Sequence, residues 1–132
     1  MQMRLPSPLP ESTEQLVTAV IGGAIAVHAA LGPGLLEGIY VDAMAIELEW
    51  RGMQFERERV VHLHYRARPL RTQRLDLVVE SQVLVEIKAV ERLLLVHQSQ
   101  VMSYLKASGL RVGLLLNFNS HFLRDGLRRI VM

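Results

Sequence analysis

The chain has 132 residues and half of them are hydrophobic, which is enough for a packed core and argues against an intrinsically disordered protein. It contains no cysteine, and this excludes disulfide bonds and thiolate zinc sites. The formal net charge is only +2, so any contact with nucleic acid would have to come from local clustering of positive side chains. A chain without cysteine suits a reducing compartment, and we expect a cytoplasmic protein.

Three prolines among the first ten residues predict a flexible lead over residues 1–11, followed by one domain over residues 12–132. Ser12 or Thr13 is expected to cap a first helix that ends near Leu31. The 16 residues that end at Leu31 carry no formal charge, but a membrane span needs roughly 20. We therefore expect a buried helix and no association with a membrane.

Gly32, Pro33 and Gly34 break the chain, and a second helix is expected over residues 35–51, with Gly52 as its stop. Tyr40 in this helix is expected to be a core aromatic with its hydroxyl near the surface.

Two strands should follow the second helix. Residues 54–65 alternate in character, with imperfect phase, and this predicts a strand that is exposed on part of one face. Residues 66–69 predict a turn, and a second strand is expected to begin at Leu70. His62 and His64 share one face of the first strand, so a zinc pair is one reading and two exposed histidines are the other.

Residues 75–88 form two apolar runs around a polar break at residues 80–82, which predicts a β-hairpin. A helix is expected over residues 96–108, ended by Gly109. The apolar run at 111–118 predicts a strand covered on both faces and parallel to its neighbour. A short last strand is expected over residues 127–132. The order α-α-β-β-β-α-β-β predicts an α/β fold, with a mixed sheet of about five strands flanked by helices.

Three charged residues lie inside the hairpin runs at 75–88: Asp76, Glu86 and Lys88. A three-residue loop would place Asp76 directly opposite Glu86, with their Cβ atoms roughly 5 Å apart. Two carboxylates that close would repel each other unless a cation lay between them, and hard cations such as Mg²⁺ prefer oxygen ligands. A slip of one residue would put the two carboxylates on opposite faces of the sheet.

The spacing from Asp76 to Glu86-Ile87-Lys88 resembles the metal-binding core of the PD-(D/E)XK nuclease superfamily. Residues 34–40, with the sequence GLLEGIY, are similar to the signature of the GxxExxY proteins, a branch of that superfamily. Residues 100–104, QVMSY, resemble the QxxxY helix motif of its exonuclease-like members. The resemblance covers about residues 12–132 and implies a restriction-endonuclease-like core.

The resemblance also implies a metal site. Asp76 and Glu86 would bind Mg²⁺ or Mn²⁺ directly, and the backbone carbonyl of Ile87 would add a ligand. Glu37 lies in the first turn of a helix, where the helix dipole alone would favour a carboxylate. The resemblance instead implies that Glu37 completes the acidic shell.

The remaining catalytic roles fall to Lys88 and to one helix. Lys88 would position or polarise the attacking water and stabilise negative charge. Gln100 and Tyr104 would orient the substrate phosphate or the Lys88 side chain, and His97 lies on the same polar stripe of the helix. Without the resemblance, such a stripe would simply face solvent.

Four arginines, at positions 66, 68, 71 and 74, surround the turn between the first two strands. They can guard a solvated strand edge with charge. They can also contact phosphates near the metal site, in which case Arg71 and Arg74 would bind substrate.

The resemblance implies a hydrolase: a metal-dependent nuclease that cleaves phosphodiester bonds, and we expect DNA in preference to RNA. The alternative is an inactive nucleic-acid-binding or protein-interaction module on the same fold. A structural role in a homodimer or a larger complex also stays open.

Overall fold

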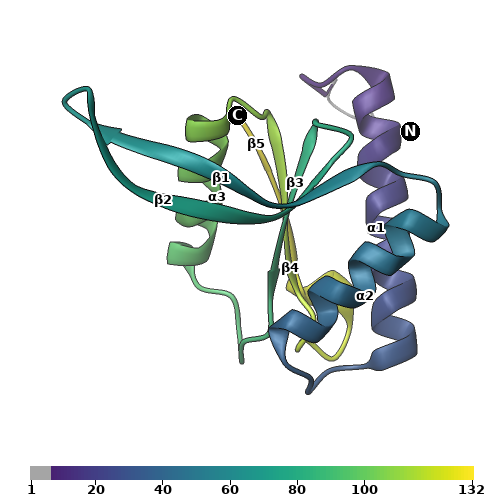
Figure 1. Cartoon of the computed structure of the whole chain (residues 1–132). Coiled ribbons are helices and arrows are strands. Elements are labelled where there is room, and N and C mark those ends of the chain that lie inside the picture. Colours follow the sequence, from purple (N-terminus) through teal and green to yellow (C-terminus); the bar gives the residue numbers. More distant parts are fainter. Residues whose placement is uncertain (1–6) are drawn as a thin grey trace, which may run out of the picture.

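The computed structural model describes residues 7–132, and Figure 1 shows its elements in chain order. Those elements are α1 (Glu11–Leu31), α2 (Glu37–Trp50), β1 (Phe55–Tyr65), β2 (Arg68–Val79), β3 (Val83–Lys88), α3 (Leu95–Ser108), β4 (Val112–Asn117), the 3-10 turn η1 (Leu123–Gly126) and β5 (Leu127–Val131). The predicted α/β class and the predicted order of helices and strands are both confirmed. The predicted helix ends lie within two residues of the observed ones.

The five strands form one mixed sheet in the order β1-β2-β3-β4-β5. β3 and β4 run parallel, with Val83 beside Val112, and the other neighbours are antiparallel. A parallel pair needs a long crossover, which α3 supplies. Every residue of β4 is buried, because helices cover both faces of the sheet at this strand. This confirms the parallel strand that the apolar run predicted.

The helices form a layer on each face of the sheet (Figure 1). α1 and α2 cover one face, and side chains such as Val20, Tyr40 and Met44 pack there in the larger core cluster. α3 covers the other face in a second cluster that includes Val101. A Cβ on Gly113 of β4 would lie 2.8 Å from Cγ1 of Val101, so only glycine lets α3 approach β4 this closely.

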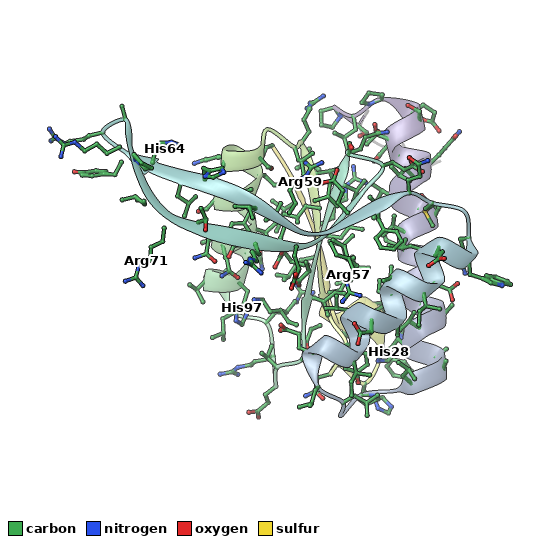
Figure 2. All side chains as sticks on the ribbon, viewed as in Figure 1. His28, Arg57, Arg59, His64, Arg71 and His97 are labelled. Atoms are coloured by element: carbon green, nitrogen blue, oxygen red, sulfur yellow. The ribbon has the colours of Figure 1, made fainter. Side chains whose placement is uncertain are left out.

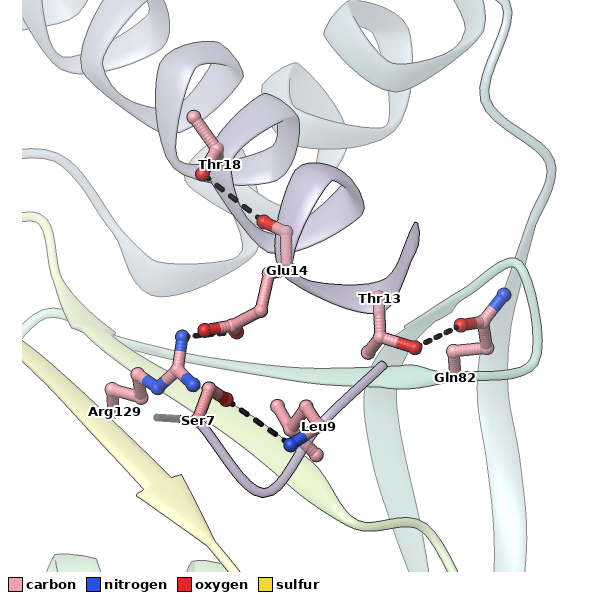
Figure 3. Close-up of polar contacts among 7 residues, drawn as sticks. All are labelled: Ser7, Leu9, Thr13, Glu14, Thr18, Gln82 and Arg129. Carbon is pink, nitrogen blue, oxygen red and sulfur yellow. Dashed lines mark hydrogen bonds and ion pairs between the residues drawn. The ribbon is translucent and has the colours of Figure 1, made fainter. Parts of the chain in front are cut away.

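The start of α1 differs from the prediction. The helix begins at Glu11, directly after Pro10, and no side chain caps it, so neither Ser12 nor Thr13 is the cap. Instead, the Thr13 hydroxyl donates a hydrogen bond of 2.8 Å to Oε1 of Gln82 in the β2–β3 turn (Figure 3). Of the predicted flexible lead, residues 1–6 lie outside the described range. Leu9 is only 7% exposed and belongs to the core, so the packing begins before residue 12.

α1 is buried on one face only, so the prediction of a buried helix is confirmed for that face. Its buried residues include Val17, Val20, Ala24 and Val27, whereas Ile25 is 53% exposed. With 21 residues and a mean hydropathy of 1.5 over its most apolar window, α1 is long and apolar enough to cross a membrane by length and composition alone. A core helix can pass the same test.

β1 and β2 extend beyond the rest of the sheet as a long two-stranded arm (Figure 1). They pair from Phe55 beside Val79 to Tyr65 beside Arg68, but the pairing of β2 with β3 is confined to residues 77–79. The turn of the arm is only two residues long, not four as predicted. Both its residues have positive φ angles, 50° at Arg66 and 63° at Ala67, and this turn geometry matches the twist of paired strands.

Tyr40 fixes the loop that leads into α2. Its hydroxyl donates to the carbonyl oxygen of Gly32 (2.6 Å) and accepts from the amide of Leu35 (3.1 Å). Its ring stacks on Phe118 with the centroids 4.8 Å apart. The expectation of a core aromatic is confirmed, since the side chain is fully buried, and its hydroxyl ends beneath the exposed loop at residues 33–35.

We expect Tyr40→Phe to lower the free energy of unfolding by about 1–2 kcal/mol, because it removes the donor to the part-buried carbonyl of Gly32 and the acceptor of the Leu35 amide. Urea denaturation would measure this change. Tyr65→Phe is the matched control, because Tyr65 is 64% exposed at the end of the arm, and its unfolding free energy should be unchanged. Equal effects of the two variants would contradict the role given to the Tyr40 hydroxyl.

Candidate active site

Asp76 and Glu86 meet where the β2–β3 pairing ends. The register runs Val79 with Val83, then Val78 with Leu84, then Leu77 with Val85, so the next opposed pair is Asp76 with Glu86, as predicted. Side chains replace the ladder hydrogen bonds at this point. The amide of Asp76 donates to Oε1 of Glu86 (3.1 Å), and the amide of Ile87 donates to Oδ2 of Asp76 (2.8 Å). The two carboxyl groups are thereby fixed between the strands.

Burial makes this carboxyl pair electrostatically unusual. Glu86 is only 4% exposed, and burial together with the charge of Asp76 raises its pKa to about 8. Burial also raises the pKa of Asp76, although the hydrogen bond from the Ile87 amide and the charge of Lys88 oppose this rise. One proton is therefore held on the pair at neutral pH when no cation is bound.

Lys88 lies two residues after Glu86 and on the same side of β3. Its Nζ donates a hydrogen bond of 3.1 Å to Oε1 of Gln100, which projects from α3. The positive charge of Lys88 opposes the rise in pKa of Asp76, Glu86 and Glu37, so the amine lies within electrostatic range of all three carboxylates. The structure thus brings Lys88 and Gln100 together beside the acidic pair.

Only part of the polar stripe on α3, which consists of His97, Gln100 and Tyr104, lies at this site. The Tyr104 hydroxyl donates to Oε1 of Gln73 on β2 at 3.3 Å, and the pKa of Tyr104 is raised by burial and by the nearby carboxylates Glu86 and Asp76. His97 has a different role. Its Nδ1 accepts the amide of Leu94 at 2.9 Å and so closes the first turn of α3.

Glu37 is the first residue of α2, and it is exposed to solvent. Partial desolvation and the charge of Asp76 raise its pKa. Glu37 and Asp76 both line a cavity of about 440 Å³, together with Arg57 and Glu58. Glu37 therefore faces the same cavity as Asp76.

The acidic residues suit a hard divalent cation. Within residues 7–132, no three His, Asp or Glu side chains are close enough to form a ready-made metal cage. The donor chemistry nevertheless fits, because Mg²⁺ is commonly held by one or two carboxylates, with water and phosphate completing its shell. A cation would also relieve the repulsion that raises the pKa of Glu86. The backbone carbonyl of Ile87 stays a predicted ligand, since the structure shows its amide, not its carbonyl, in contact with Asp76.

The predicted basic residues lie farther out. Nη1 of Arg74 is 3.8 Å from Oε2 of Glu58, and both side chains are exposed. Arg71 projects from the arm, on its outer part (Figure 2). His62 and His64 are exposed on the same arm and form no cluster of three ligands with the other acidic or histidine side chains that the structure describes.

Sequence reasoning missed Glu58 and Asn117. Glu58 has a φ of 55° and is left out of the β1–β2 pairing between Arg57 and Arg59. It lies opposite Asp76, and the charge of Glu58 raises the pKa of Asp76. The imperfect alternation of residues 54–65 was the available signal. Asn117 is 1% exposed and holds the loop after Lys88 through two hydrogen bonds to the backbone of Val90. Nothing in the sequence singled it out.

Comparison with known proteins gives one match. A sequence profile of the PD-(D/E)XK nuclease superfamily matches residues 14–130. No curated protein and no solved structure matches the chain.

Proposed function

The chain belongs to the PD-(D/E)XK nuclease superfamily, and from this premise we propose that it is a metal-dependent hydrolase of phosphodiester bonds. The observation that supports this most directly is the buried pair of Asp76 and Glu86 beside the Lys88–Gln100 hydrogen bond. Burying two carboxylates that repel each other costs free energy. A cation bound by both would offset this cost and would supply the Lewis acid for hydrolysis.

Each residue would have a distinct role. Asp76 and Glu86 would hold Mg²⁺ or Mn²⁺, with Glu37 at the edge of the shell, and the cation would supply Lewis acidity and activate water. The Lys88 ammonium would hold the attacking water or the phosphate and stabilise the negative charge that develops. Gln100, which accepts a hydrogen bond of 3.1 Å from Lys88 Nζ, would hold the Lys88 side chain in that role.

We further propose that DNA is the substrate in preference to RNA, and that the protein acts in the cytoplasm. The DNA proposal rests on the superfamily alone. The motif at residues 34–40 supports placement in the GxxExxY branch, because it contains Glu37 and Tyr40, which face the cavity and fix the preceding loop respectively.

Metal-dependent cleavage tests the proposal. Purified protein would be incubated with Mg²⁺, Mn²⁺ or EDTA on single-stranded DNA, duplex DNA and RNA. We expect cleavage only with a metal ion, and a loss of at least about 100-fold in Asp76→Asn, which removes a ligand charge at constant size. Asp125→Asn changes an exposed aspartate outside the site and should cleave normally. Salt-sensitive binding without cleavage would favour the inactive binding module instead.

A further inference from the structure

The charges of the chain are strongly segregated. Residues 59–75, which form most of the arm, contain five arginines, two histidines and no acidic residue. Because the whole chain carries a net charge of +2, the remainder carries −3. The arm therefore carries a local cluster of positive charge that the small net charge of the whole chain does not reveal.

Three of these arginines form no ion pair within the part of the chain that the structure describes. Arg59 pairs with Glu56, and Arg74 lies near Glu58, both toward the base of the arm. Arg66, Arg68 and Arg71 are exposed and form no ion pair with any carboxylate in residues 7–132. Protection of a strand edge would be served by charges of either sign. A single sign along the outer half of the arm points to an anionic ligand.

The arm is long enough to contact a nucleic acid several base pairs away from the carboxylates. A strand rises roughly 3.3 Å per residue, so Arg71 and Arg68 lie about 16 Å and 26 Å along β2 from Asp76. A duplex rises about 3.4 Å per base pair, so these distances correspond to roughly five and eight base pairs. The turn adds an exposed Tyr65, whose ring can stack on a base.

We propose that the arm is a second contact for nucleic acid, in which Arg66, Arg68 and Arg71 bind backbone phosphates roughly five to eight base pairs from the bond that is cut. The position of the cut rests on the proposed function, whereas phosphate binding by the arm does not. The arm gives the enzyme a preference for long substrates, because a short one cannot reach both the carboxylates and the three arginines.

Salt-dependent binding in EDTA tests the arm without cleavage. The triple variant Arg66→Ala, Arg68→Ala, Arg71→Ala would be compared with a control that also loses three exposed arginines, Arg111→Ala, Arg124→Ala, Arg128→Ala. On a 24-base-pair duplex, the arm variant should bind at least about tenfold more weakly at 0.1 M salt. Its slope of log affinity against log salt should fall by about 2–3. The control should keep the native slope, and replacement of the three arm arginines by lysine should restore it.

Substrate length and cleavage complete the test. With Mg²⁺ present, the arm variant and the native protein should cleave a hairpin with a stem of about five base pairs at similar rates, because a stem this short cannot reach from the carboxylates to the arginines. Equal slopes for the arm variant and its control would overturn the arm proposal even if cleavage were normal. Loss of slope in the arm variant, with no cleavage by the native protein, would support the arm and refute the nuclease. Loss of binding to anionic lipid vesicles, with nucleic-acid binding intact, would assign the arm to membranes and overturn the proposal.

Discussion

Replacing Lys88 with alanine is expected to lower the rate of metal-dependent cleavage by roughly 10²–10³-fold at saturating substrate. The ammonium of Lys88 is fixed by Gln100 at 3.1 Å and lies within electrostatic range of Asp76, Glu86 and Glu37. A fixed charge of this kind stabilises a transition state without reorganisation, so its removal should lower kcat more than it raises KM. Steady-state kinetics on a labelled duplex would measure both constants.

The chain offers a matched control for this experiment. Lys106 is its only other lysine, and it lies exposed on α3, where it lines a different cavity beside Arg59 and His62 of β1. Lys106→Ala should retain the native kcat. A normal kcat in Lys88→Ala, or an equal loss in both variants, would show that the amine beside the carboxylates does not take part in the reaction.

Replacing Glu86 with glutamine is expected to remove most of the pH dependence of folding stability in the metal-free protein. The folded pKa of Glu86 is raised from 4.5 to about 8, so the folded state holds a proton that the unfolded state has lost. The contribution of Glu86 to the stability of the native protein should therefore be largest below about pH 4.5, and it should decrease as the pH rises to about 8. The loss should be on the order of 5 kcal/mol.

Urea denaturation at about pH 5, 7 and 9 in EDTA would measure this effect. Glutamine retains an oxygen for the Asp76 amide but carries no charge, so the stability of Glu86→Gln should hold as the pH rises. Glu49→Gln, which changes an exposed glutamate of α2, should follow the native protein. Added Mg²⁺ should stabilise the native protein most at about pH 9, where the carboxylates are ionised. Parallel pH profiles for the native protein and Glu86→Gln would contradict the buried environment of Glu86.

Much of the fold follows from local pattern. The apolar run in β4 implied a strand buried on both faces, and Gly109, with a φ of 77°, ends α3 as expected because glycine tolerates that conformation. The spacing from Asp76 to Glu86 fixed their opposition once the hairpin loop was three residues long, because strand side chains alternate with period two. These features depend on near neighbours in the chain.

Other features of the site depend on contacts between distant segments. The left-handed φ of Glu58 arises within the twisted β1–β2 pair, and only the packed sheet brings that carboxylate opposite Asp76. The desolvation that raises the pKa of Glu86 depends on the assembled sheet, in which Leu115 of β4 pairs beside Glu86. The sequence by itself determined the order of elements and the acidic pair. Only the tertiary structure decided how deeply the pair is buried and how far the arm extends, because burial and strand pairing are properties of the assembled sheet.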